Sequence, residues 1–553
     1  DKAEAIIGHF GLGFYSSFMV ANKVEIYTLS YKDEAKAVHW SCEGTPEFTM
    51  EDTIKAERGT EVVLHIDEEF QQYLEDATIE GLLKKYCKFL PVEIAFGKKK
   101  EWKDGKQVEL DEENIINDVN PAWMRKPADL KDEDYSTFYH ELYPTQFDEP
   151  LFHIHLNVDY PFHLTGILYF PKIKNNMDVH RNKIQLYCNQ VYVTDEVENI
   201  VPEYLTLLHG VIDSPDIPLN VSRSYLQSDN NVKKISSHIT KKVADKLAEL
   251  YKNDREDFEK KWDDIKLFIQ FGMLSDEKFY ERAIGFALLK NLDGKYATLD
   301  EYKAQIKEAQ TDKDGNLVIL YTNDPAAHYT FIERAKAKGY DVLLMDGELD
   351  VHAMSQMEQK SESESESEKK GMLRFVRIDS DSIENLIRKE EAKKDDYTDE
   401  QREGIRKAFD ACLPKEEKLT YYVTPEAAAE DTLPVFLTQN EFMRRMKEMS
   451  AHQQGMAFYG QMPDQYNVVV NTSHPLIKEL FGKMTSETVM EQPETKEGEE
   501  PKPAVEKTVY TLSGEDEKIK QLIDIAFLAS GQLKGEGLAK FVERSIRLLK
   551  NEE

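Results

Sequence analysis

Alternation between apolar and polar residues characterises much of the first hundred positions. This period of two predicts β-strands over 24–31, 35–42, 60–66 and 92–96. Phe14 and Phe18 lie four residues apart, which predicts a helix over 14–21 with both rings on one face. A second helix is predicted over 78–90, and Pro91 ends it. The region is therefore α+β and corresponds to the second half of a domain.

Apolar residues become sparse beyond Gly97. Positions 98–119 are rich in charge, which predicts a linker between domains. Further strands are predicted over 151–160, 164–170 and 183–193. A helix over 230–253 carries one apolar stripe, formed by Val232, Ile235, Ile239 and Val243. Another helix follows over 258–274, and a strand–helix–strand pattern over 316–346 predicts a small parallel sheet.

Two segments of biased composition interrupt this pattern. The run "SESESESEKK" at 361–370 predicts a solvated loop. The run "EQPETKEGEEPKP" lacks residues that could form a core, which predicts a disordered acidic insertion near 487–507.

Two amphipathic helices are predicted at the end of the chain. Their apolar stripes are Ile519, Leu522, Ile523 and Phe527, and then Leu538, Phe541, Val542 and Leu549. Two short helices do not easily bury both stripes, so dimerisation through a helical bundle is one expectation. Packing of the stripes back onto the preceding block is the alternative.

Composition narrows the function classes. A chain of 553 residues exceeds the size of one core, so two to four domains are expected. A net charge of −33 disfavours nucleic-acid binding. The four cysteines form no C-x-x-C pair, which indicates a reducing, cytoplasmic compartment and no zinc site. No apolar run is long enough to predict a membrane span, and no signal peptide is visible. The chain begins without Met, and we expect it to lack an N-terminal part.

The residues Gly8-His9-Phe10-Gly11-Leu12-Gly13 precede the first predicted helix. Glycine-rich turns let backbone N–H groups converge on an anion beside a helix N-terminus, which makes a phosphate site one interpretation and a tight turn the other. The chain has no G-x-x-x-x-G-K-[ST] motif, so a P-loop enzyme is excluded.

Three further stretches could bind ligands or partners. Thr60 heads a predicted strand and could present its hydroxyl to a ligand. Arg223 lies in a polar loop after a proline-rich turn, where it could bind a phosphate or form a surface ion pair. Phe442, Met446 and Met449, with Met443 beside them, form a stripe that is either core or an adaptable binding face. His153 and His155 are interpreted as structural, so no metal ligand is assigned.

In order along the chain, four of these stretches resemble the heat-shock protein 90 family. "IGHFGLGFYSSFMVANKV" is similar to its phosphate segment, "GTEVVLHI" to its Gly-Thr strand, "NPAWMRKP" to its middle-domain entry and "DSPDIPLNVSRSYLQ" to its catalytic arginine loop. The ending "RLLKNEE" lacks the acidic pentapeptide of eukaryotic cytosolic members, which points to the bacterial branch.

The resemblance implies a multidomain α+β and α/β fold. Residues 1–97 would be the C-terminal half of an ATP-binding domain, a remnant of the GHKL-type α/β sandwich. After the linker at 98–119, residues 120–393 would form an αβα middle domain, and residues 394–553 a mixed C-terminal dimerisation domain.

The resemblance also implies an ATP-dependent chaperone that works as a homodimer on client proteins, with co-chaperones as further partners. Gly8 would be a lid hinge, Gly11, Leu12, Gly13 and Phe14 would hold phosphates, and Thr60 would lie on the adenine side. Arg223 and Gln227, with Asn220 beside them, would reach the γ-phosphate. Trp123 and the stripe of Phe442, Met443, Met446 and Met449 would face clients. The general base and the residue that binds Mg²⁺ would lie upstream of residue 1.

Two other functions stay open. As written, the chain could be a non-catalytic client-binding dimer. It could also be a DNA-processing ATPase of the same sandwich class, although the charge of −33 argues against that.

Overall fold

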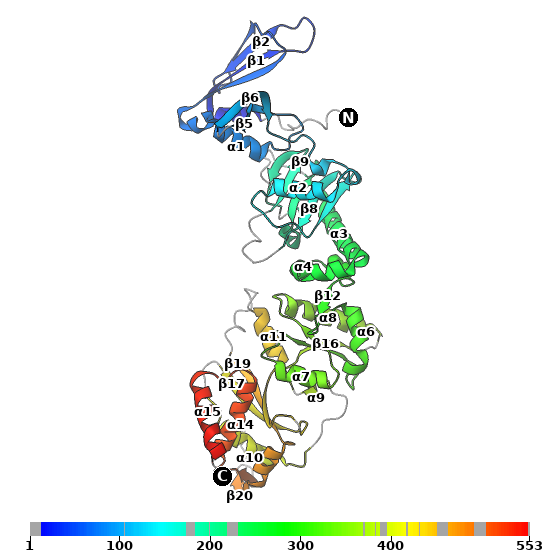
Figure 1. The fold of residues 1–553 in the computed structure, drawn as a ribbon, viewed down its shortest axis with the longest axis vertical. Coiled ribbons are helices and arrows are strands. Elements are labelled where there is room, and N and C mark those ends of the chain that lie inside the picture. The colour runs from blue at the N-terminus through cyan, green and yellow to red at the C-terminus, as the bar shows by residue number, and fades with distance from the viewer. Residues whose placement is uncertain are drawn as a thin grey trace, which may run out of the picture. The chain divides into compact units, whose positions relative to one another are not determined.

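We describe a computed structural model of the chain (Figure 1). The described residues are 13–103, 106–172, 183–197, 200–217, 230–368, 371–381, 383–387, 395–415, 419–430, 432–450, 463–491 and 505–550. They divide into two compact units, residues 1–249 and residues 250–553. Each unit combines helices with sheets, so the molecule is an α+β multidomain protein, as expected. The finer boundaries at 97, 119 and 393 stay predictions.

The first unit begins with an antiparallel sheet, called here the first sheet, of order β3-β2-β1-β4. Its strands are β1 (Ala21–Leu29), β2 (Ala37–Cys42), β3 (Phe48–Thr53) and β4 (Gly59–Ile66). The helix expected over 14–21 is a shorter 3₁₀ helix, η1 (Phe14–Met19), because β1 already begins at Ala21. α1 (Asp76–Tyr86) matches the second predicted helix. β3 was missed because its sequence, "FTMEDT", is largely polar.

The predicted linker at 98–119 contains regular structure. β5 (Ala95–Lys103) and β6 (Lys106–Ile115) form an antiparallel hairpin. Lys98 lies 2.6 Å from Asp111 across the strands, so the charges that suggested a linker pair instead with opposite charges. The strands were not predicted, and the role of 98–119 as a linker between domains stays a prediction.

The rest of the first unit surrounds a second sheet, called the middle sheet, of order β10-β9-β11-β8-β7. Its strands are β7 (Phe152–Val158), β8 (Leu164–Phe170), β9 (Ile184–Cys188), β10 (Val191–Thr194) and β11 (His209–Asp213). β11 runs parallel to β9 and antiparallel to β8, and all five of its residues are buried. α2 (Asp132–Leu142) contributes Phe138 and Tyr139 to the core on this sheet.

α3 (Asn230–Asn253) links the two units along the chain. Its predicted stripe is buried at Val232, Ile235, Ile239 and Val243, which confirms the periodicity. The second unit continues with α4 (Arg255–Ser275), α5 (Glu277–Ala283), the hairpin of β12 (Leu288–Lys290) and β13 (Tyr296–Thr298), and α6 (Leu299–Gln310).

A parallel sheet of order β15-β14-β16 follows, and it confirms the predicted βαβ unit. Its strands are β14 (Leu317–Thr322), β15 (Val342–Leu344) and β16 (Leu373–Arg377). Figure 1 shows α6, α7 (Tyr329–Ala337) and α8 (Asp350–Glu368) around it, and α9 (Ile383–Leu386) comes next in the chain. The solvated loop expected at 361–370 was wrong for 361–368, which continue α8. Glutamate favours helix, and Ser363 donates its hydroxyl hydrogen to the Gln359 carbonyl one turn earlier.

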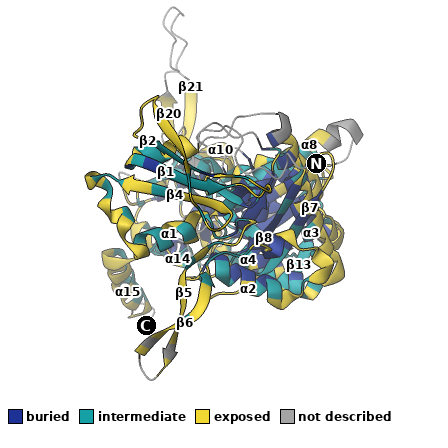
Figure 2. Cartoon of the chain, turned by 90° about the horizontal axis from the view of Figure 1, so that it is seen from above, coloured by how far each residue is buried: buried dark blue, intermediate teal, exposed yellow. Residues whose placement is uncertain are grey.

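The last part of the second unit contains a C-terminal sheet of order β17-β19-β18. Its strands are β17 (Leu419–Glu426), β18 (Val435–Gln439) and β19 (Asp464–Asn471), and its helices are α10 (Asp399–Asp410), α11 (Glu441–Ser450), α13 (Pro475–Gly482), α14 (Asp516–Ala529) and α15 (Gly535–Lys550). The flanks of the predicted disordered insertion form an antiparallel hairpin of β20 (Thr485–Glu491) and β21 (Val505–Thr511). That prediction was wrong for the flanks, where β-branched Thr and Val favour strands. Residues 492–504 lie outside the described part. Figure 2 shows how exposed this hairpin is.

Candidate functional site

The first sheet has one apolar and one polar face. Its register places apolar side chains on one face: Val24, Ile26, Val38, Trp40, Val62 and Leu64. Thr28 and Thr60 pair at the end of the same face, and their hydroxyl oxygens lie 2.8 Å apart. Thr60 is exposed, so its hydroxyl is accessible at the edge of an apolar surface.

The segment after the glycine motif packs on that apolar face. The Phe14 ring meets the Trp40 ring edge-to-face at 5.5 Å. Gly13 precedes η1, and among the described residues nothing lies within 4 Å of where its Cβ would be. The structure therefore brings Phe14 and Thr60 onto one face, as a shared ligand site requires. Gly8, Gly11 and Leu12 lie outside the described residues.

The opposite face carries a charged cluster that the sequence analysis missed. Glu25 lies between two histidines on neighbouring strands, with His65 Nε2 at 2.6 Å and His39 Nε2 at 3.1 Å from its carboxylate. The hydrogen bonds from His65 and Lys23 lower the pKa of Glu25 to about 2. Only cross-strand register brings these three strands together, so no spacing in the sequence indicated it. Among the described residues, no cluster of His, Cys, Asp or Glu has the arrangement of a metal site.

The catalytic candidates Arg223, Gln227 and Asn220 lie outside the described residues. The chain that leads to them is held in place, because the Asp216 carboxylate accepts a hydrogen bond from the His163 N–H at 2.6 Å. The Ser214 hydroxyl donates to the His163 carbonyl at 2.6 Å. A cavity of about 510 Å³ lies at this point, and its lining includes Thr165.

Trp123 is a core residue rather than a surface residue. Its side chain is 1% exposed and packs on Phe89 with ring centroids 4.7 Å apart. Its Nε1 donates a hydrogen bond to Asp213 Oδ2 at 3.3 Å, and the Gln190 N–H donates to the same oxygen at 2.8 Å. The client-facing role expected for Trp123 was wrong, because β11 and α2 cover it.

Asp213 is a residue that the sequence analysis missed. It ends β11, ten residues before Arg223, and burial raises the pKa of its carboxyl, although the bonds from Gln190 and Trp123 act in the opposite direction. Trp123 and Asp213 together fix the point at which the chain enters the Arg223 segment. An acidic residue at the end of an apolar run was the signal available in the sequence.

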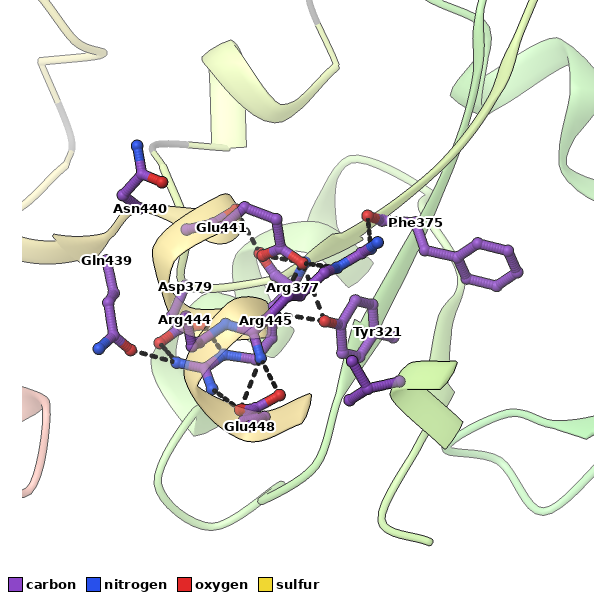
Figure 3. Close-up of polar contacts among 12 residues, drawn as sticks. Tyr321, Phe375, Arg377, Asp379, Gln439, Asn440, Glu441, Arg444, Arg445 and Glu448 are labelled. Carbon is purple, nitrogen blue, oxygen red and sulfur yellow. Dashed lines mark hydrogen bonds and ion pairs between the residues drawn. The ribbon is translucent and has the colours of Figure 1, made fainter. Parts of the chain in front are cut away.

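Of the stripe predicted on α11, Phe442 alone is exposed. Phe442 is 68% exposed, and Met443, Met446 and Met449 are half-buried. The buried side of the helix is its charged side, where Arg444 is 5% exposed (Figure 3). The core interpretation of the stripe therefore fails for Phe442, which leaves a binding face as the interpretation that fits its exposure.

The two C-terminal helices behave differently. The α14 stripe of Ile519, Leu522, Ile523 and Phe527 is buried in the core of the C-terminal sheet. None of the residues of α15 is buried, and its exposed apolar side chains are Leu538, Val542, Ile546 and Leu549. The α14 stripe therefore packs onto the preceding block, which was the alternative expectation. The α15 stripe stays exposed in the described part of the chain.

Known proteins match this chain along nearly its whole length. The family model described as Hsp90 protein matches residues 97–497. The chain belongs to the Hsp90 family. Proteins named "Chaperone protein HtpG" are 54% identical in Bacteroides thetaiotaomicron and 55% identical in Porphyromonas gingivalis; each match covers 99% of this chain, and 85% and 84% of those proteins. A protein of the same name from Francisella tularensis is 34% identical over 65% of this chain and 58% of its own.

Membership of the Hsp90 family confirms the resemblance drawn from the four sequence stretches. Proteins of the Hsp90 family are ATPase chaperones. Within the described part of the chain, no helix combines the length and apolar character that crossing a bilayer demands.

Proposed function

We propose that this protein is an ATP-dependent molecular chaperone that acts as a homodimer on non-native client proteins in the cytoplasm. The observation that carries the proposal is the match of 54% identity over 99% of the chain to a protein named as a chaperone. The geometry supports it, because Phe14 and Thr60 share one face of the first sheet.

The residues present suit a nucleotide on this face. None of the described residues blocks the approach of a phosphate to the Gly13 backbone, and the Thr60 hydroxyl can reach the adenine side. Gly11, Leu12, Gly13 and Phe14 would offer N–H groups to the phosphates, and Gly8 would act as a hinge. ATP with Mg²⁺ supplies the phosphoryl group whose hydrolysis drives the cycle. No Mg²⁺ ligand is assigned among the residues of this chain.

Arg223, Gln227 and Asn220 would approach the γ-phosphate from the segment that follows Asp213. A guanidinium stabilises the charge that develops on the transferred phosphoryl group, and its arrival from another part of the chain ties hydrolysis to closure. The bonds from His163 to Asp216 and from Trp123 to Asp213 would then position the start of that segment.

Clients would bind the α11 stripe, which is half-buried at its methionines and exposed at Phe442. Methionine side chains adapt to varied apolar partners, and Phe442 is the most exposed apolar residue of this stripe. A net charge of −33 would keep the complex soluble. Trp123 takes no part in this face, because it is buried.

An Arg223→Ala variant, expressed from the complete gene, tests the ATPase part of the proposal. We expect hydrolysis to fall by about a hundredfold or more while nucleotide affinity changes little, because the guanidinium acts in the transition state. Arg406→Ala is the matched control, since Arg406 pairs with Glu403 on the surface of α10.

Unchanged hydrolysis in Arg223→Ala would contradict the assigned role, and an equal loss of affinity would make Arg223 a ground-state ligand instead. A third outcome is that wild type and both variants suppress client aggregation but none of them hydrolyses ATP. The protein is then the non-catalytic client-binding dimer.

A further inference from the structure

The helix α11 docks on the protein by its charged side. Arg444 is 5% exposed and Glu441 is half-buried, while Phe442 on the other side is 68% exposed. Amphipathic helices usually bury the apolar face and leave the charged face in water. The reversed orientation of α11 therefore needs a cause on the surface that receives it.

That surface is the carboxyl end of the parallel sheet. In the order β15-β14-β16, the chain leaves β14 for β15 on one side and returns to β16 on the other. The position just outside the carboxyl ends of β14 and β16, called the crevice here, is therefore a topological switch point, where open α/β sheets bind their ligands. Tyr321 lies near the end of β14 and Arg377 ends β16, so both line the crevice.

The carboxylate of Glu441 occupies this crevice (Figure 3). The Tyr321 hydroxyl donates to Glu441 Oε1 at 2.9 Å, and the Arg377 backbone N–H donates to Oε2 at 3.2 Å. These two donors, one from each strand, hold both carboxylate oxygens as they would hold a small bound anion.

Two guanidiniums on the same helix complete the surroundings of Glu441. Arg444 lies 2.6 Å and Arg445 2.7 Å from Oε1. Burial opposes ionisation of Glu441, yet the charges of Arg444 and Arg445 hold the pKa of this carboxyl below its ordinary value. The occupant of the crevice is therefore a carboxylate anion rather than a neutral acid.

The remaining polar contacts fix the orientation of α11 on the protein. Arg445 donates to Glu358 of α8 at 2.6 Å and to the Phe375 carbonyl of β16. On the other side, Arg377 donates to Gln439 at 3.1 Å. Buried ionic networks specify one arrangement more than they add stability, since apolar replacements of such groups are often equally stable. Here the network selects which face of α11 points away from the protein.

We propose that the crevice between β14 and β16 is a carboxylate-binding site, and that Glu441 fills it as an internal ligand that sets the orientation of α11. This inference goes beyond the proposed function, since it requires neither nucleotide nor client. Its consequence is that the exposure of Phe442 on α11 depends on a site in the parallel sheet.

The test is rescue by a free carboxylate in a Glu441→Ala variant of the full chain. Removal of the side chain leaves donors around a gap of carboxylate size, so amide hydrogen exchange over 441–450 should quicken about tenfold, equivalent to about 1.4 kcal/mol. Sodium acetate at about 0.2 M should slow this exchange again, and sodium chloride at the same ionic strength should not.

Asp464→Ala is the matched control. Asp464 pairs with Lys447 of the same helix at 2.7 Å but lies on β19, outside the crevice. Acetate should not alter exchange in that variant. Adding Tyr321→Phe to Glu441→Ala should weaken the acetate effect, since one donor is lost.

Slow exchange of the β17 and β19 amides shows whether Glu441→Ala has folded, and Glu441→Gln replaces it if it has not. Glutamine leaves no gap for acetate to fill. The supporting result for Glu441→Gln is therefore faster exchange over 441–450 than in wild type. Unchanged exchange, an acetate effect no larger than that of chloride, or equal rescue in Asp464→Ala overturns the proposal.

Discussion

His209 shows how a single buried residue sets a pH limit on the middle sheet. Its Nδ1 lies 3.0 Å from the Tyr139 hydroxyl, in a core position of β11. Burial lowers the pKa of His209 to about 4, because the charged ring cannot be solvated there. His153 on β7 shows the same effect, also with a pKa of about 4.

We expect stability to fall as the pH drops from about 6.5 to about 4. The unfolded chain binds a proton on His209 near pH 6.5 and the folded chain only near pH 4, so acid favours unfolding within this window. Denaturant unfolding gives the free energy of unfolding at pH 7 and at pH 4.5. Between these two pH values, His209→Asn should lose about 2 kcal/mol less of this free energy than wild type. Asparagine can still accept the Tyr139 hydrogen bond. Equal losses in both proteins would show that His209 does not titrate in this window.

At the scale of elements, close backbone approach decides how the exposed hairpin attaches. Gly404 lies on α10 against β21, where a Cβ would be 2.6 Å from the Tyr510 carbonyl oxygen and 2.7 Å from Met484 Cε. The carbonyl belongs to the backbone and cannot move aside cheaply. The absence of a side chain at Gly404 therefore lets β20 and β21 anchor on α10.

Gly404→Ala should destabilise the C-terminal part by about 1–3 kcal/mol, even though alanine favours helix by about 1 kcal/mol. Gly482→Ala is the control, because Gly482 ends α13 and, among the described residues, nothing lies within 4 Å of its added Cβ. The denaturant midpoints of the two variants measure the change in stability. A Gly404→Ala protein as stable as Gly482→Ala would mean that β21 moves freely away from α10.

At the scale of the whole molecule, α15 is a described helix whose apolar side is left exposed. It pairs with α14 through polar contacts, such as Arg544 with Asp524 at 2.6 Å, while Leu538, Val542 and Ile546 stay exposed. A second copy of the same helix would cover this stripe, as a twofold interface requires.

Replacing Leu538, Val542 and Ile546 together by Ser should convert dimers into monomers, because the apolar area that drives association is lost. Light scattering over a dilution series measures the change. Lys540→Ser on the same helix is the control and should stay dimeric, since Lys540 is exposed and pairs only with Glu536 of its own helix in the described structure. Dimers that survive the triple replacement would place the interface elsewhere.

Most of the elements could be predicted from local pattern. The stripe of α3, the βαβ unit and the strands β7 and β8 follow from periods that neighbouring residues set by themselves. β11 was not predicted, because a fully buried strand shows no alternation. The α8 extension and the β5–β6 hairpin were missed because polar composition alone does not exclude regular structure.

By itself, the sequence determined the family, the order of its motifs and the elements with a clear period, because these depend on residues close together in the chain. Only the tertiary structure decided what each side chain faces. Trp123 and Phe442 are both large apolar residues, yet β11 and α2 cover Trp123, whereas Phe442 stays exposed on a helix that meets β14 and β16 through the Glu441 carboxylate. Burial depends on partners distant in the sequence, and no local pattern contains them.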